Sequence, residues 1–134
     1  MRKKQGQTLD ELYDIAVIGC GPAGLSAALN AKIRNKNIKI FGTGMCSIKM
    51  HKSPNIFNYL GCSGLSGEEL RRKFLLHAKD AGIELTKVKA DTIFPMGDEF
   101  NISCKDKIYR AKSVIVATGI SHGKAIIGET EYLG

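Results

Sequence analysis

The sequence has no hydrophobic run as long as a membrane-spanning helix requires. A bilayer crossing needs about 20 consecutive apolar residues, and the basic start MRKKQGQTLDE is not followed by the apolar segment of a secretory signal. These absences predict a cytoplasmic protein that does not associate with membranes. The mean hydropathy of -0.10 agrees with that expectation.

Cysteine and histidine are sparse, and their spacing matches no familiar site. The sequence contains four cysteines, Cys20, Cys46, Cys62 and Cys104. They form neither a C-x-x-C redox pair nor the paired spacing of a zinc site, so buried free thiols are expected. The three histidines have no acidic or thiol partner nearby in the sequence. No metal site and no catalytic residue is therefore predicted.

Acidic residues are absent from Ile15 to Gly67, although the chain contains 13 of them and has a net charge of +7. The basic residues of this stretch are Lys32, Arg34, Lys36, Lys39, Lys49 and Lys52. A field of one sign favours a phosphate-bearing ligand or an acidic protein partner, and a generic solubilising surface explains it about as well. Nucleic acid is not expected, because no aromatic stacking pattern or reading motif accompanies the basic residues.

The first half of the chain contains a strand, helix and strand in succession. YDIAVIG, which starts at Tyr13, and IKIF, residues 38–41, are apolar runs of strand length. PAGLSAALNAKIRNK, residues 22–36, places small and apolar residues where a helix could pack close to a sheet. This pattern predicts a βαβ unit. Residues 42–66 have no clear period and are interpreted as an irregular loop of a length that is usually functional.

The second half begins with a helix and continues with short strands. Ser66 followed by Glu69 is a capping-box pattern, which predicts a helix over about residues 67–81. The stretches IELTKVKA, DTIFPM, EFNISCK and KIYRAK alternate apolar with polar residues and predict a small antiparallel meander. SVIVATG then indicates a buried strand of the parallel type.

Gly19, Gly21 and Gly24 form a G-x-G-x-x-G motif between the first strand and its helix. Gly19 permits the tight turn, Gly21 lets backbone amides approach a pyrophosphate, and Gly24 lets the helix press against the sheet. Strand, glycines and helix in this order predict dinucleotide binding. The second strand ends in IFGTG without a carboxylate, so either Thr43 or main-chain groups hold the ribose, or the affinity is lower. The missing carboxylate does not by itself select FAD over NAD.

With this meander inserted before VIVATG, the chain resembles the N-terminal FAD-binding part of the thioredoxin reductase family of flavoproteins. The resemblance is carried by YDIAVIGCGPAGLSAAL, NYLG, LSGEELRRKF, AKSVIVATG and GETEYLG. GTGMCSIKMHKSPNIFNYLG stands where the family has a Gly-Gly-Gln-like segment, and with KIRNK and PMGDEF it is similar to the clostridial ferredoxin-dependent branch. The resemblance implies an α/β fold, a Rossmann-like FAD/NAD(P)-binding domain with a parallel sheet and a small antiparallel meander in a three-layer ββα arrangement.

The resemblance also implies domain bounds and FAD contacts. It predicts an N-terminal tail at residues 1–12, the FAD-binding domain at residues 13–122 and the start of a linker at residues 123–134. The implied FAD contacts are Gly19, Cys20, Gly21, Pro22, Ala23 and Gly24 at the diphosphate, Phe41, Gly42 and Thr43 at the adenosine, Asn58 at the flavin, Val88 near the adenine, and Ala117, Thr118 and Gly119 along the cofactor. Plainer readings also stand: Asn58 as a loop-capping amide, Val88 as core and Cys20 as structural.

By the same resemblance, the parent protein is a thioredoxin-disulfide reductase that passes electrons from ferredoxin or NADPH through FAD to a dithiol and then to thioredoxin. The family's C-x-x-C follows a stretch like GETEYLG, so this chain lacks it and is expected to be inactive alone. A homodimer is an assembly that the resemblance allows. Two alternatives stay open: a non-catalytic nucleotide-binding module from a truncated or split gene, and an NAD-binding dehydrogenase domain, which the meander disfavours.

Overall fold

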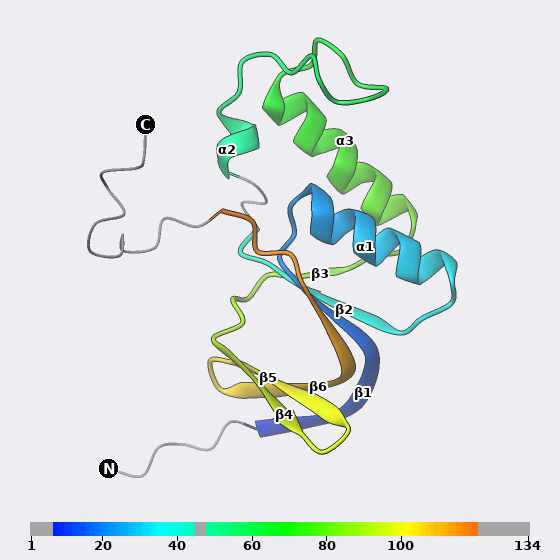
Figure 1. Cartoon of the computed structure of the whole chain (residues 1–134), viewed down its shortest axis with the longest axis vertical. Helices are drawn as coiled ribbons and strands as arrows, with labels where there is room; N and C mark the ends of the chain where they lie inside the picture. The colour runs from blue at the N-terminus through cyan, green and yellow to red at the C-terminus, as the bar shows by residue number, and fades with distance from the viewer. Residues whose placement is uncertain (1–6, 45–47, 121–134) are drawn as a thin grey trace, which may run out of the picture.

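A six-stranded mixed sheet forms the framework of the structure, a computed structural model that describes residues 7–44 and 48–120. The strand order is β3-β2-β1-β6-β5-β4. The strands are β1 (Gln7–Ile18), β2 (Ile38–Phe41), β3 (Leu85–Thr86), β4 (Thr92–Met96), β5 (Glu99–Cys104) and β6 (Lys107–Val116). The helices are α1 (Pro22–Ile33), α2 (Ile48–His51) and α3 (Gly67–Asp80). Figure 1 shows α1 and α3 together on one side of the strands and the β4–β5 hairpin on the other.

The parallel part of the sheet confirms the predicted βαβ unit. β1 pairs in parallel with β2 on one side and with β6 on the other, and β2 pairs in parallel with β3. α1 connects β1 to β2, and its buried residues include Gly24, Ala28 and Ala31. Because these side chains are small, the helix axis can lie close to the sheet.

The core is divided between the two faces of the parallel strands. Ala16 and Ile18 of β1 pack with Ile102 and Tyr109 of the meander. Val17, which points the opposite way because side chains alternate along a strand, packs with residues of the helices. Fully burying one large aliphatic side chain contributes about 1.5–3 kcal/mol. The two clusters confirm the expected three layers of meander, parallel strands and helices.

α3 begins and ends where the sequence predicts. The Ser66 side chain accepts a hydrogen bond from the Glu69 amide at 3.3 Å, and the Glu69 carboxylate accepts one from the Ser66 amide at 2.8 Å. The helix runs from Gly67 to Asp80 and is followed by Gly82, whose φ of 70° lies in the left-handed region that glycine favours. Among the described residues, no helix is long and apolar enough to cross a membrane.

Three strand assignments differ from the predictions. KIYRAK and SVIVATG were expected to be separate strands, but Lys107–Val116 is one strand, β6, because no glycine or proline interrupts it. IELTKVKA was expected in the meander, but only Leu85 and Thr86 form a strand, which pairs with β2. The chain then turns, with the Val88 amide donating to the Thr86 carbonyl at 2.8 Å. β1 starts at Gln7, earlier than Tyr13, and pairs with β6 from there.

The connection between β2 and α3 is less irregular than residues 42–66 suggest. It contains the single-turn helix α2 and an isolated antiparallel bridge between Ile56 and Leu65. The Ile56 amide donates to the Leu65 carbonyl in this bridge, and the Gly64 amide donates to the Ile56 carbonyl, both at 2.8 Å. Part of this connection is therefore ordered by regular hydrogen bonding.

Candidate dinucleotide-binding site

The predicted site residues come together at the carboxyl edge of the parallel strands. Three main-chain hydrogen bonds tie the strand ends to one another. The Gly19 amide donates to the Phe41 carbonyl at 2.8 Å, the Gly42 amide to Thr86 at 3.1 Å, and the Ala117 amide to Ile18 at 2.8 Å. In open α/β sheets ligands bind at this edge, outside the carboxyl ends of the strands. The segments around Gly19, Gly42 and Ala117, far apart in the sequence, therefore share one candidate site.

Two glycines of the G-x-G-x-x-G motif are required by close backbone approach. Gly19 has φ of 114°, and a Cβ there would lie 2.1 Å from the Ala117 carbonyl oxygen. A Cβ on Gly24 would lie 1.9 Å from the Gly19 carbonyl oxygen. Both separations are far below any real carbon–oxygen contact. The start of α1 is thus pressed onto the ends of β1 and β6 in the way the motif predicts.

Among the residues that the structure describes, no side chain caps the N-terminus of α1. Gly21 is the N-cap residue and makes no side-chain capping bond, Pro22 occupies the first turn, and no acidic residue is present there. By contrast, α3 has a complete capping box with Glu68 and Glu69 in its first turn. The first amides of a helix lack intrahelical partners and carry a partial positive charge. The α1 end, which includes the Ala23 amide, is therefore suited to an anionic group.

On the side predicted for the adenosine, backbone groups dominate. The Phe41 side chain is only 1% exposed and meets the Tyr109 ring edge-on, with the ring centroids 5.0 Å apart. Any contact from Phe41 to a ligand is therefore confined to its main chain. A Cβ on Gly42 would lie 2.3 Å from the Cys20 sulfur, so Gly42 closely covers the glycine turn. Thr43 is exposed, and Val88 is half-buried against the core between sheet and meander.

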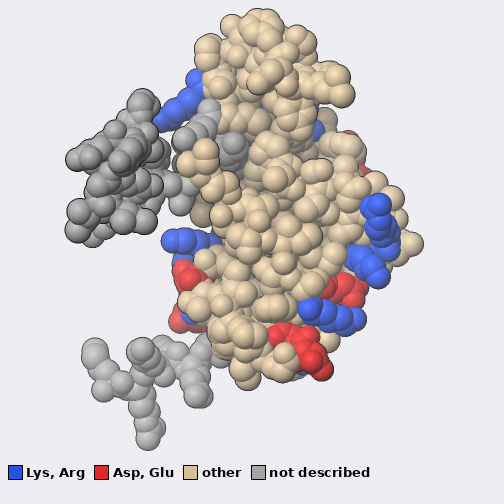
Figure 2. Space-filling model, in the orientation of Figure 1, with Lys and Arg blue, Asp and Glu red and all other residues tan. Residues whose placement is uncertain are grey.

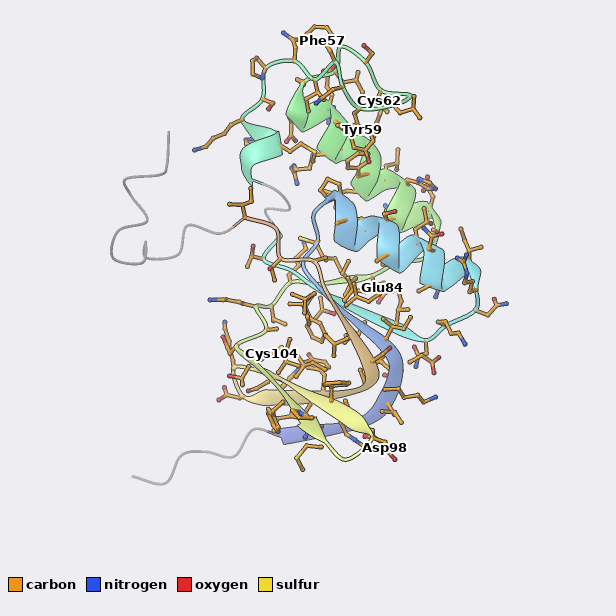
Figure 3. All side chains as sticks on the ribbon, viewed as in Figure 1. Phe57, Tyr59, Cys62, Glu84, Asp98 and Cys104 are labelled. Carbon is orange, nitrogen blue, oxygen red and sulfur yellow. The ribbon has the colours of Figure 1, made fainter. Side chains whose placement is uncertain are left out.

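The remaining predicted contacts lie on two exposed segments. Thr118 and Gly119 follow β6 and are exposed, whereas Ala117 is half-buried. Asn58 is exposed in the loop between α2 and α3, beside Tyr59, whose ring lies 5.2 Å from that of Phe74. Figure 3 shows Phe57 and Tyr59 on this loop near α3. The contact of Asn58 with a flavin stays a prediction.

A groove of about 150 Å³ runs between α1 and α3 beside this loop. Its lining includes Pro22 and Leu25 of α1, Tyr59 of the loop, and Phe74 and Ala78 of α3. The loop that carries Asn58 and the first turn of α1 both line this groove, through Tyr59 and Pro22. It therefore borders the glycine motif on the helical side of the sheet.

The cysteines differ from the expectation of free thiols in one respect. Cys62 and Cys104 are free, and burial raises the pKa of the Cys104 thiol to about 11. Cys20 is 5% exposed and disulfide-bonded, so it is no free thiol. Cys46 lies outside the described residues. Among the described residues, no group of three or more His, Cys, Asp or Glu side chains could hold a metal ion.

The acid-free stretch does not form a single basic surface around the glycine motif. Lys32 and Arg34 stand at the C-terminal end of α1, about 15 and 18 Å along the helix from its start at a rise of 1.5 Å per residue. Lys39 lies over the rings of Tyr13 and Tyr109, with its Nζ 5.5 and 5.7 Å from their centroids. On the face drawn in Figure 2, lysine and arginine side chains lie in several separate places. Folding disperses these charges, so they do not single out a phosphate.

An ion-pair cluster between α2 and α3 was not anticipated from the sequence. The His51 Nδ1 lies 2.7 Å from Glu68 Oε2, and Arg71 donates to both carboxylate oxygens of Glu68 at 2.9 and 3.1 Å. Hydrogen bonds from Arg71, and then from His51, lower the pKa of Glu68 to about 2. His51 and Glu68 are 17 positions apart, so no local spacing could reveal the pair.

Comparison with known proteins places this geometry in a family. Residues 13–133 match the pyridine nucleotide-disulphide oxidoreductase family. The thioredoxin reductase of Listeria innocua is 32% identical over 93% of this chain, which corresponds to 40% of that protein. Among solved structures, a ferredoxin-flavin thioredoxin reductase from Clostridium acetobutylicum superposes with a TM-score of 0.83 at 49% identity, covering 92% of this chain and 43% of that one.

A second solved relative, the thioredoxin reductase of Lactococcus lactis, has a TM-score of 0.78 at 33% identity, covering 90% of this chain and 40% of that one. The chain thus spans about two-fifths of the length of the relatives that it matches. These similarities confirm the resemblance to thioredoxin reductases, including the clostridial ferredoxin-flavin enzymes. The chain belongs to the pyridine nucleotide-disulphide oxidoreductase family.

Proposed function

We propose that this chain is the FAD-binding part of a flavoprotein that reduces a protein disulfide, as thioredoxin reductases do. The observation that carries the proposal is the uncapped N-terminus of α1, held against the strand ends by Gly19 and Gly24. A helix end whose first amides lack intrahelical partners, with no acidic side chain in its first turn, fits a diphosphate. FAD contains such a group between its adenosine and flavin halves.

The chain's own residues would divide the work of binding. The amides at Ala23 and Gly24 face the diphosphate, while Gly21 leaves room for it beside the backbone. Main-chain groups around Gly42, with the Thr43 hydroxyl, hold the ribose in place of the carboxylate that this chain lacks. Ala117, Thr118 and Gly119 border the cofactor where the chain leaves β6. Asn58 reaches the flavin end from the loop beside α3.

For the whole protein we infer the reaction from the relatives. When bound, a flavin would supply two-electron reduction of a disulfide, having taken the electrons as a hydride from NADPH or one at a time from two ferredoxin molecules. Ferredoxin and NADPH are the two candidate donors, and thioredoxin is the proposed acceptor through a C-x-x-C dithiol. Within that protein, the proposed role of these 134 residues is to bind and orient the cofactor.

A titration with nucleotides tests this proposal. The purified chain is mixed with FAD, FMN or NADH, and binding is followed by the flavin absorbance and fluorescence or by the nicotinamide fluorescence. We expect FAD to bind more tightly than FMN, because FMN lacks the adenosine diphosphate part that α1 would hold. ADP should compete with FAD for the same reason.

Two results would contradict the proposal. Preference for NADH over FAD would instead support a dehydrogenase-type NAD domain. Failure of ADP to displace FAD would show that the glycine motif does not hold the diphosphate. Circular dichroism on each sample ensures that the chain is folded when binding is measured.

A further inference from the structure

We propose that Tyr59 is a positioning residue for the flavin end of the cofactor site: its ring, packed against Phe74 of α3, holds in place the loop that carries Asn58. This inference rests on the proposed FAD-binding function, because Asn58 is the residue predicted to meet the flavin. Tyr59 acts through this neighbour in the chain and not by touching the cofactor. The inference deepens the proposed function by stating what fixes Asn58 relative to the helices.

The contact that holds the loop is made by two aromatic rings. The centroids of the Tyr59 and Phe74 rings lie 5.2 Å apart, with 52° between the ring planes, a separation typical of favourable aromatic pairs. Phe74 is half-buried and packs against the core cluster that includes Val17 and Ala78. Tyr59 therefore reaches from an exposed loop to a ring that the core of the protein keeps in place.

The backbone of the loop is closed on both sides of Asn58. The antiparallel bridge between Ile56 and Leu65 closes the base of the loop. Farther along, the Cys62 amide donates to the Tyr59 carbonyl at 3.0 Å and makes a turn. Asn58 lies between the bridge and this turn, directly before Tyr59. A displacement of the Tyr59 ring would therefore move Asn58.

The other large side chains near the tip of the loop are held less well. Phe57 is 72% exposed and Leu60 is 100% exposed, whereas Tyr59 is 42% exposed. A side chain that stays in water gains little free energy from the hydrophobic effect on folding, so it does little to hold a loop. Of these three side chains, Tyr59 is the one with a ring contact to α3.

The ring contact bears on the cofactor site through the groove between α1 and α3. Tyr59 and Phe74 line this groove together with Pro22 and Leu25 of α1. Pro22 directly follows Gly21, the N-cap residue of α1. The groove therefore borders the helix end that is proposed to hold the diphosphate. Because the flavin of FAD lies beyond the diphosphate from the adenosine, a loop beside this helix end is well placed to meet it.

Holding the loop in advance should favour the binding of the flavin end. A loop that becomes ordered only on binding loses conformational entropy at that moment, and the loss weakens the affinity. FAD should therefore bind less tightly when the ring contact is removed. ADP ends at the diphosphate and has no flavin, so its affinity should not depend on Tyr59. The difference between the two ligands isolates the flavin end of the site.

The test compares the affinities for FAD and for ADP, each measured by isothermal titration calorimetry on samples whose folding is checked by circular dichroism. Tyr59→Ala removes the ring, and Tyr59→Phe keeps the ring without its hydroxyl. Phe74→Leu removes the aromatic partner but keeps an apolar side chain in the core. Leu60→Ala is the matched control, because Leu60 follows Tyr59 on the same loop and is 100% exposed.

We expect Tyr59→Ala to bind FAD about three- to tenfold more weakly than wild type, with an ADP affinity within about twofold of wild type. Phe74→Leu should show the same FAD-specific loss, and combining the two substitutions should add little because both remove one contact. Tyr59→Phe and Leu60→Ala should match wild type for both ligands. A merely structural role for Tyr59 would lower the stability without separating the two ligands.

The outcomes distinguish this inference from the proposed function. If wild type binds FAD and ADP, and Tyr59→Ala loses affinity for neither ligand or for both equally, the positioning role is overturned while cofactor binding stands. If wild type fails to bind FAD or ADP, the proposed function fails for this chain and the positioning role fails with it. Hydrogen exchange then still tests the loop itself: exchange at the Cys62 amide, which is bonded to the Tyr59 carbonyl, should be several-fold faster in Tyr59→Ala. Unchanged exchange would show that the ring contact does not hold the loop.

Discussion

Replacing Gly24 with alanine directly tests how the glycine motif works. The new Cβ would lie 1.9 Å from the Gly19 carbonyl oxygen, whereas an ordinary contact is 3.4–4 Å, so α1 and the end of β1 would have to separate by about 1.5 Å. The atom in the way belongs to the backbone and cannot rotate aside. Gly19 in turn abuts the Ala117 carbonyl, which leaves little room for it to retreat.

The expected loss of stability follows from two opposing effects. Overpacking a well-packed position costs about 1–3 kcal/mol, and the upper end applies where backbone must move. Alanine is favoured over glycine within a helix by about 1 kcal/mol, which offsets part of this cost. The net destabilisation should be about 2 kcal/mol. For a chain of this length it corresponds to a fall in melting temperature of about 8 °C.

FAD binding should suffer more than stability does. If α1 moves away from the strand ends, at least one hydrogen bond from its first amides to a charged oxygen is lost, at about 1.5–3 kcal/mol. Affinity should then fall about tenfold or more. Urea denaturation gives the stability, and FAD fluorescence gives the affinity. Ser26→Ala, an exposed substitution on the same helix, is the control and should change neither by much.

One result would refute this reasoning. If Gly24→Ala unfolds with a free energy within about 0.5 kcal/mol of wild type and binds FAD equally well, the close approach of α1 to β1 is unimportant. A loss of stability without a loss of affinity would support the close packing of α1 on β1. It would also show that this packing is not needed for FAD binding.

Further predictions concern the cap of α3 and the two free thiols. Ser66→Ala removes the side-chain half of the capping box and should lower the free energy of unfolding by about 1 kcal/mol in urea; an unchanged midpoint would show that the cap contributes nothing. Cys104, whose pKa burial raises to about 11, should react with a thiol reagent at pH 8 only after denaturation. Half-buried Cys62 should react in the native protein, and equal rates for the two thiols would contradict this expectation.

Sequence patterns predicted the fold best where the structural cause is local. The capping pair Ser66 and Glu69 fixed the start of α3, and the small residues of α1 indicated a helix close to a sheet. Strand partners were harder to infer because pairing joins distant residues. IELTKVKA alternates like a meander strand, yet only Leu85 and Thr86 reach β2, and the turn after Thr86 ends the pairing.

The sequence predicted those parts of the candidate site that depend on close approaches of the backbone. Gly19 and Gly24 reveal close approaches because no other residue fits there, and the structure shows both. Side-chain partnerships were not predictable in this way. His51 meets Glu68 only because α2 rests on the start of α3. The position of Lys39 over Tyr13 shows similarly that an acid-free sequence does not make a basic surface.

The continuity of β6 links the meander to the proposed cofactor site. Its first half also pairs with β5, where the paired residues Ile102 and Tyr109 are almost completely buried. All of β6, from Lys107 to Val116, pairs in parallel with β1, and the strand ends directly before the Ala117 carbonyl against which Gly19 packs. A displacement of the meander would therefore be transmitted along one strand to the glycine turn. The meander is thus joined through β6 to the carboxyl edge at which the predicted diphosphate contacts lie.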